Sequence, residues 1–239
     1  MINEEQIFTQ GGEMNFFTEV VGCDHQVDCA QHGALNLVNT PSHFPAWSLV
    51  NPTRKDVLVI ATNPGQQGVR FTNQYERIIK KPRNIEARNG ELLEQLRKNT
   101  RMLFQEENDK FHGPLVRALA IIMDVPVGQV LDLIQFTNIV KCSTCCNFGV
   151  LWKEFKEYLV DKCIETFFKQ ELRLLSPRII FLYFDKSTRD KVIRPRLERL
   201  LTEINLMNAR MINILRPSRV QDDVDATAIQ KARDQYRLR

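Results

Sequence analysis

The sequence predicts an α/β protein with a three-layer α/β/α architecture and a central, mainly parallel, four-stranded sheet. Short, continuously apolar segments alternate along the chain with longer segments of helical spacing. The apolar segments lack the in–out alternation of a half-exposed strand, so both faces of the sheet are expected to be covered by helices. Three of these segments end in polar motifs, as expected where a parallel sheet binds its ligand at the carboxyl ends of its strands.

The strands and helices can be placed in order along the chain. Strands are expected within DVLVIATNPG (56–65), LDLIQFTNIV (131–140), RIIFLYF (178–184) and RMINIL (210–215). Helices are expected within a polar, basic insertion at 74–109, an apolar segment at 113–125, a segment at 155–175, a charged segment at 187–204, and a short tail from 227 onward.

The domain organisation follows from length and from the first part of the chain. A chain of 239 residues is within the range of one α/β domain, so we expect a single domain over residues 1–239. Residues 1–55 carry scattered Gly, Asn, Pro and His without a helical or alternating period. We therefore expect them to form an irregular lead-in wrapped on that domain.

The expected location is cytoplasmic. No stretch approaches the ~18 consecutive apolar residues that a membrane span requires, so no membrane partner is expected. The amino-terminal segment is acidic and lacks the apolar core of a signal peptide. We expect a monomer whose six cysteines are reduced thiols and not disulfides.

Charge is concentrated in two segments. The net charge is only +4, but residues 77–101 carry eight Lys and Arg against three Glu, and residues 185–239 carry thirteen against eight acidic residues. A patchy basic surface is typical of a protein that binds the phosphate backbone of DNA. Solvated helix faces would give the same pattern, so charge alone does not decide between the two.

The cysteines fall into two groups. Cys23 and Cys29 form the first group, and the second comprises Cys142, Cys145, Cys146 and Cys163. Such grouping in a reduced compartment raises the hypothesis of a metal or iron–sulfur site.

An ordered set of motifs carries a resemblance to a known family. Asn63-Pro64-Gly65 ends the first strand, FTNIVKC (136–142) ends the second, Cys163 lies on the next helix, and PRII (177–180) opens the third strand. This order resembles the uracil-DNA glycosylase superfamily over roughly residues 56–220. The iron–sulfur uracil-DNA glycosylases of bacteria and archaea are the most similar branch.

The resemblance implies a pocket that holds one base flipped out of DNA. Asn63 would position the attacking water, and because it cannot ionise, a modest chemical rate is expected. Asn138 would hydrogen-bond the base, Phe71 would stack on it, and Gly65 would lie beside it. Without the resemblance, Asn-Pro-Gly reads as a tight turn, Asn138 as a cap and Phe71 as a core residue.

The second family motif departs from its usual form. The family usually carries His-Pro-Ser there, and its His stabilises the departing base anion. This chain has Arg216-Pro217-Ser218-Arg219. Arg216 could still stabilise the anion, whereas Pro217, Ser218 and Arg219 would contact DNA. The larger Arg puts ordinary uracil specificity in doubt and favours a different, modified base or a loss of activity.

The resemblance also implies a 4Fe–4S cluster. Cys142 and Cys163 match two of the family's ligands, and Cys23 and Cys29 would supply the other two, although the spacing of that pair is wider than usual. Cys145 and Cys146 are competing ligand candidates. Zinc, with help from His25 and His32, and the absence of any metal are the alternatives.

The expected function is that of a monofunctional DNA glycosylase that excises uracil or another altered base from DNA. No lysine stands at the motifs to form a Schiff base, so no lyase activity is expected. The alternative is a catalytically weak or inactive DNA-binding relative of the same fold. A small-molecule hydrolase is a weaker possibility, because the chain has neither G-x-S-x-G nor a Gly-rich phosphate loop.

Overall fold

The protein has a mixed α/β fold with a four-stranded parallel sheet, as the sequence predicts. The structure is a computed structural model and describes residues 10–38, 40, 43, 45–47, 50–51, 53–62, 67–106, 109, 111–146, 148–215 and 224–238. Contacts group the chain into two compact units. Unit 1 comprises Met1–Ser48, Thr62–Asn99 and Asn138–Leu174, and unit 2 comprises Leu49–Ala61, Thr100–Thr137 and Leu175–Arg239.

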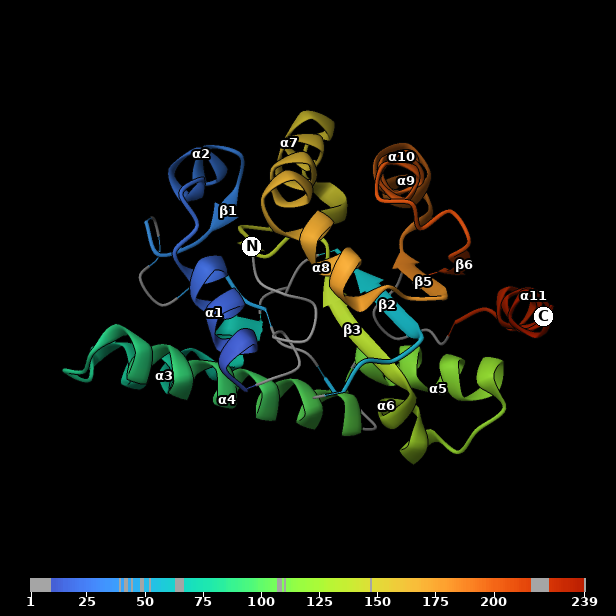
Figure 1. Ribbon diagram of the computed structural model, residues 1–239, viewed down its shortest axis with the longest axis horizontal. Helices are drawn as coiled ribbons and strands as arrows, with labels where there is room; N and C mark the ends of the chain where they lie inside the picture. Colours follow the sequence, from blue (N-terminus) through green and yellow to red (C-terminus); the bar gives the residue numbers. More distant parts are fainter. Residues whose placement is uncertain are drawn as a thin grey trace. The chain divides into compact units, whose positions relative to one another are not determined.

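The sheet forms the centre of unit 2. Its strand order is β3 (Ile134–Asn138), β2 (Val57–Ala61), β5 (Ile179–Phe184) and β6 (Arg210–Leu215). β5 pairs in parallel with both β2 and β6 (Figure 1). Every residue of β2 is buried, and so is β5 after its first residue. The continuous apolar strands therefore have the two-sided burial that their composition predicts.

The strand order creates a switch point between β2 and β5. After β2 the chain forms β3 on one side of it, and then forms β5 and β6 on the other side. In open parallel sheets, ligands bind outside the carboxyl ends of the strands at such a point. The chain leaves β2 at this position and enters the Asn63-Pro64-Gly65 segment directly after Thr62.

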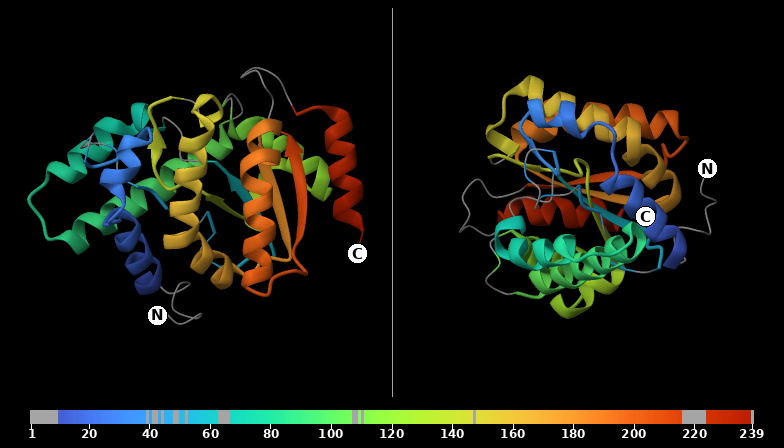
Figure 2. Two further views of the ribbon diagram at one scale, coloured as in Figure 1. Left: turned by 90° about the horizontal axis from the view of Figure 1, so that it is seen from above. Right: turned by 90° about the vertical axis from the view of Figure 1, so that its left-hand side faces the viewer.

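Helices cover both faces of the sheet in unit 2. Figures 1 and 2 show α5 and α10 on opposite faces and α11 beside the edge strand β6. One face carries α5 (His112–Met123), η1 (Val127–Gln129) and α6 (Val130–Leu133). The other carries α9 (Lys186–Thr188), η4 (Arg189–Ile193) and α10 (Arg194–Glu203), and α11 spans Ala226–Arg237.

Apolar packing and a buried amide pair hold unit 2 together. Ten of the twelve residues of α5 are buried, and its side chains share one core cluster with Val59, Phe181 and Ile212 of the sheet. The Asn51 side chain donates to the carbonyls of Leu131 and Ile134 (2.5 and 2.6 Å). Gln135 returns a bond to the carbonyl of Asn51 at 3.0 Å. These bonds fix the segment before β2 to the start of β3.

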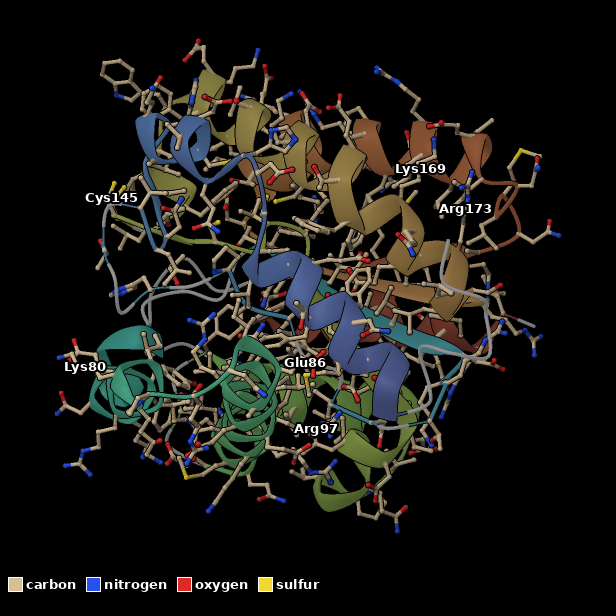
Figure 3. All side chains as sticks on the ribbon, turned by 60° about the vertical axis from the view of Figure 1, so that its left-hand side comes forward. Lys80, Glu86, Arg97, Cys145, Lys169 and Arg173 are labelled. Atoms are coloured by element: carbon tan, nitrogen blue, oxygen red, sulfur yellow. The ribbon has the colours of Figure 1, made fainter. Side chains whose placement is uncertain are left out.

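Unit 1 consists of helices and a two-stranded ribbon. Its helices are α1 (Gln10–Val21), α2 (Gln26–Gln31), α3 (Gln67–Lys80), α4 (Ile85–Gln105), η2 (Phe148–Val150) and α7 (Lys153–Cys163), which continues into η3 (Ile164–Phe168) and α8 (Lys169–Leu175). β1 (Ala34–Leu35) pairs antiparallel with β4 (Ser143–Thr144). Arg97 of α4 forms an ion pair with Glu13 of α1, and Figure 3 shows Arg97 beside that helix.

The expectation of an irregular lead-in over residues 1–55 is wrong where α1 and α2 form. α1 buries Phe16, Phe17, Val20 and Val21, and the ring centroid of Phe16 lies 4.6 Å from that of Trp47. The helical period is hidden because the apolar residues come as adjacent pairs and because two glycines stand near the start of the helix. Tertiary burial, and not local propensity, stabilises this helix.

Several boundaries differ from expectation. Residues 130–133, expected in the second strand, form α6, and β3 begins only at Ile134. The basic insertion at 74–109 consists of two helices, α3 and α4, with Pro82 between them. The helix expected over 155–175 contains a π-helical turn at η3.

A membrane-spanning segment was also sought among the described helices. None of them alone is long and apolar enough to cross a membrane; only the pair His112–Met123 and Val127–Leu133, bent by 98°, meets the length and composition together.

Candidate metal centre and base-binding residues

Unit 1 brings together four cysteines that are far apart in the sequence. Cys23 lies between α1 and α2, and Cys29 lies within α2. Cys142 follows β3, and Cys163 is the last residue of α7. All four line one pocket. They are the four ligand candidates that the family resemblance implies.

The pocket is narrow. Including its mouth, it contains about 290 Å³ of space not occupied by atoms, of which about 10 Å³ is open to the centre of a water-sized sphere. Its remaining walls include Pro45, Phe167, Lys141 and Lys162. The exposed lining is almost entirely apolar, and no carboxylate lines the pocket among the described residues.

The four thiols resist ionisation in the absence of a cation. Burial raises the pKa of Cys23 and Cys142, raises the pKa of Cys29 to about 12 and that of Cys163 to about 11. The neighbouring thiols raise the pKa of Cys29 and Cys142 further. Each sulfur thus feels the charge of others around the same pocket. A metal centre that binds thiolates would compensate this cost.

The donor set suits an iron–sulfur cubane. A single zinc ion, with Zn–S distances of about 2.3 Å, draws its sulfurs to within about 3.8 Å of one another. Among the residues that the structure describes, no three His, Cys, Asp or Glu side chains are spaced to hold one metal ion. A cubane binds each of four thiolates through a different iron, so its ligands surround a larger core. Four buried thiols around one pocket match that requirement.

The competing ligand candidates lie elsewhere or have other contacts. Cys145 is exposed, lies against Gly33 and does not line the pocket, and neither does Cys146 (Figure 3). His32 stacks on Tyr158, with ring centroids 3.7 Å apart, and its Nδ1 lies 2.8 Å from the carbonyl oxygen of Asp28. His25 is the only histidine among the pocket's described lining residues.

A buried ion pair lies directly beside the cysteines. The Lys141 side chain is 1% exposed and donates to Oε2 of Glu171 at 2.6 Å and to the carbonyl of Asn138 at 2.7 Å. The other carboxylate oxygen of Glu171 accepts a bond from Trp47 Nε1 at 2.8 Å. The backbone N–H of Lys141 also donates to Cys163 Sγ at 3.5 Å. Lys141 therefore links the thiol pocket to the end of β3.

Asn138 presents an unsatisfied acceptor at the carboxyl end of β3. Its Oδ1 is buried and has no hydrogen-bond partner among the described residues. Such an atom costs about 1–3 kcal/mol unless a ligand or water satisfies it. A base that offers an N–H group on its Watson–Crick edge would satisfy it.

Phe71 lies on α3 and is 3% exposed. Its ring meets that of Tyr75 edge-on, with centroids 6.4 Å apart. Tyr75 in turn accepts a hydrogen bond from Asn99 at 3.0 Å. Phe71 is thus packed in the interior of unit 1, and its role in stacking on a base stays a prediction.

Six site candidates lie outside the described residues, namely Asn63, Gly65, Arg216, Pro217, Ser218 and Arg219. They follow β2 and β6 directly in the sequence, since these strands end at Ala61 and Leu215.

Glu171 and Trp47 are site residues that the sequence analysis did not identify. Lys141 belongs to the quoted FTNIVKC motif, but its charge gave no sign that it would be buried. Glu171 lies 30 positions away on a helix of mixed charge, so only the fold reveals the pair. No signal in one sequence distinguishes such a glutamate from its exposed neighbours.

No protein-family model, curated protein or solved structure matches this chain.

Proposed function

We propose that this protein is a monofunctional DNA glycosylase of the uracil-DNA glycosylase type, which flips out uracil or another altered base and hydrolyses its glycosidic bond. One observation carries the proposal beyond the sequence resemblance. Four cysteines at positions 23, 29, 142 and 163, which the resemblance implies as ligands, line a single buried pocket. An unrelated α/β protein has no reason to gather these four side chains.

The proposed cofactor is a 4Fe–4S cluster held by Cys23, Cys29, Cys142 and Cys163. When bound, it would act as a structural cross-link between distant parts of the chain. These cysteines belong to the α1–α2 segment, the loop after β3 and the end of α7. The Lys141 N–H at Cys163 Sγ supplies the kind of outer-shell hydrogen bond that orients and tunes thiolate ligands.

Base recognition is assigned to Asn138. Its unsatisfied Oδ1 would accept a hydrogen bond from an N–H group of the flipped base, and its amide group would donate to a base carbonyl. The carbonyl of Asn138 is fixed by Lys141 Nζ at 2.7 Å, which restrains the residue from the interior side. The acceptor is thus held in place before a base arrives.

The reaction itself is hydrolysis. The bond between sugar C1′ and the base nitrogen breaks with its electron pair going to the base, and the oxygen of a water molecule bonds to C1′. The water gives up one proton, and the departing base takes up one. Asn63 would orient that water, and the guanidinium of Arg216 would stabilise the negative charge that develops on the base.

A second candidate function keeps the fold and loses the chemistry. Arg216 stands where the resemblance calls for His, and this departure favours a DNA-binding relative with weak or no activity. Both candidates bind DNA, and only the glycosylase leaves abasic sites.

The test is a strand-cleavage assay for abasic sites on duplexes and single strands that contain uracil, hypoxanthine or modified cytosines. The purified protein is expected to be brown, to absorb near about 400 nm, and to create abasic sites on at least one substrate. DNA binding without abasic sites on any of these substrates would replace the glycosylase by the second candidate. Iron and sulfide analysis of the same sample reports the cluster separately.

A further inference from the structure

We propose that a basic hollow beside the edge strand β6 binds phosphate groups of the DNA backbone. This inference rests on the proposed function and specifies how it holds its substrate. The hollow has a volume of about 480 Å³ and lies within unit 2. The lining residues that matter are Lys186, Arg189, Arg194, Asn213, Lys231 and Gln235.

The hollow concentrates positive charge. Its four cations come from two parts of the chain, with Lys186, Arg189 and Arg194 on α9–α10 and Lys231 on α11. No carboxylate lines it among the described residues. Four like charges around one concavity repel one another, and an anion bound between them relieves that repulsion.

The four cations are not equally engaged. Arg189 forms two hydrogen bonds with Asp190, at 2.7 and 3.1 Å, and Arg194 bonds Glu198 at 2.8 Å. Lys186 and Lys231 are exposed, and neither has a hydrogen bond or ion pair with another described residue. These two lysines can therefore bind a phosphate without breaking an existing contact.

Asn213 adds a polar group to the wall of the hollow. Its strand neighbours Ile212 and Ile214 belong to the apolar core, so the alternation of β6 turns Asn213 to the opposite face. Its Oδ1 is buried without a partner among the described residues. An amide at this place can donate to a phosphate oxygen through Nδ2 and bind a bridging water through Oδ1.

The position along the chain favours a DNA strand over a free anion. β6 carries Asn213 and ends at Leu215, and Arg216-Pro217-Ser218-Arg219 follows at once. That segment is the one expected to meet DNA. A backbone phosphate near the flipped base would therefore be bound by residues that directly precede it. Lysines on two separate elements also suit a row of phosphates better than one compact anion.

The experiment measures binding to a normal duplex of about 20 base pairs by fluorescence anisotropy, between about 50 and about 300 mM KCl. The variant is Lys186→Ala/Lys231→Ala, and the matched control is Lys98→Ala/Arg199→Ala, which removes two exposed cations outside the hollow. The hollow variant should bind about ten-fold more weakly, and the slope of log affinity against log salt should fall by about two. Melting curves check that both variants are folded.

Equal weakening in the two variants would show that the hollow has no special role and would overturn the proposal. Tight binding of dAMP or pyrophosphate by the wild type, lost in the hollow variant while duplex binding is kept, would also overturn it. The proposed glycosylase activity stands or fails separately. Abasic sites formed by wild type and hollow variant, with unchanged duplex binding, would refute only the hollow.

Discussion

At the scale of single residues, Asn138 combines a buried, unsatisfied side-chain oxygen with a backbone carbonyl fixed by Lys141. A structural asparagine in a strand normally finds a partner for both groups, because an unmatched buried acceptor destabilises the fold. The unmatched oxygen at the end of a central strand is therefore a binding feature and not a packing feature.

We expect Asn138→Ala to lower base excision by about 10- to 100-fold, because a hydrogen bond to the base is worth about 1–3 kcal/mol. Binding to duplex without a target base should be unchanged. Asn63→Ala should abolish excision with the same binding profile. The control is Asn208→Ala, at an exposed position. Abasic-site kinetics and anisotropy measure the two properties, and a loss of duplex binding in parallel with excision would contradict the base-binding role.

The buried pair Lys141–Glu171 makes a second residue-scale prediction. Lys141→Met leaves the Glu171 carboxylate buried without its cation, so the free energy of unfolding should fall by about 3–5 kcal/mol. Arg194→Met, at a partly exposed pair, should cost no more than about 0.5 kcal/mol. Urea denaturation measures both. Similar costs for the two variants would show that Lys141 is not the buried partner that the structure describes.

Asp109 predicts a pH dependence. Burial acts to raise the pKa of Asp109, but hydrogen bonds from the His112 ring, the His112 N–H and the Phe111 N–H outweigh it, so the pKa lies below its usual value. A lowered folded-state pKa stabilises the protein above the unfolded value of about 4, and this contribution is lost as pH falls through the folded pKa.

Asp109→Asn should therefore be less stable than wild type by about 1 kcal/mol near pH 7, and the difference should shrink as the pH approaches 3. Urea midpoints at both pH values give the comparison. Asp132→Asn, at an exposed carboxylate, should show a small difference at both. A difference that grows on acidification would mean that the sign of the shift is wrong.

At the scale of elements, α11 depends on one arginine from the sheet. Arg210, the first residue of β6, donates to the carbonyls of Gln235 (3.0 Å), Tyr236 (3.4 Å) and Leu238. These carbonyls belong to the last turn of the helix, which has no intrahelical donors of its own. A cation at a helix carboxyl end also interacts favourably with the helix dipole.

Arg210→Ala should loosen the last turn of α11 and lower stability by about 1–2 kcal/mol. Hydrogen exchange is the measurement, with faster exchange expected for the amides near the helix end and unchanged exchange in β5. Asp124→Ala, which removes two exposed contacts to Arg233 and Arg237, is the control and should have less effect. Equal protection of the helix end in wild type and Arg210→Ala would contradict the capping role.

At the scale of the whole molecule, the four cysteines all belong to unit 1, and the sheet core lies in unit 2. Loss of the proposed cluster should therefore weaken unit 1 selectively. The apolar cluster around α5 and the central strands contains none of these cysteines.

Cys142→Ser and Cys163→Ser should each lose the absorbance near about 400 nm and expose the amides of α1, α2 and α7 to faster exchange. Amides of β2 and β5 should keep their protection, since their core remains intact. Cys145→Ser is the matched control, because its thiol is exposed outside the pocket, and it should keep the absorbance. Full colour in Cys142→Ser, or its loss in Cys145→Ser, would exclude the proposed ligand set.

Much of this fold could be predicted because strands buried on both faces leave a strong signal. β6 was expected at 210–215 and forms there, and β5 differs from expectation by one residue. α1 could not be predicted, because its apolar residues acquire a common face only when Phe16 meets Trp47. The cysteine grouping suggested a metal site, but the pairing of Lys141 with Glu171 depends on tertiary structure.

The π-helical turn at Ile164–Phe168 has a consequence for any change of chain length nearby. It interposes an unusually wide loop of backbone between Cys163, in the thiol pocket, and Glu171, in the ion pair with Lys141. Deleting one residue there would restore ordinary α-helical winding and rotate whatever follows by about 100° about the helix axis. The angular phase of this single turn thus sets whether one helix can serve the sulfur cage and the buried lysine at once.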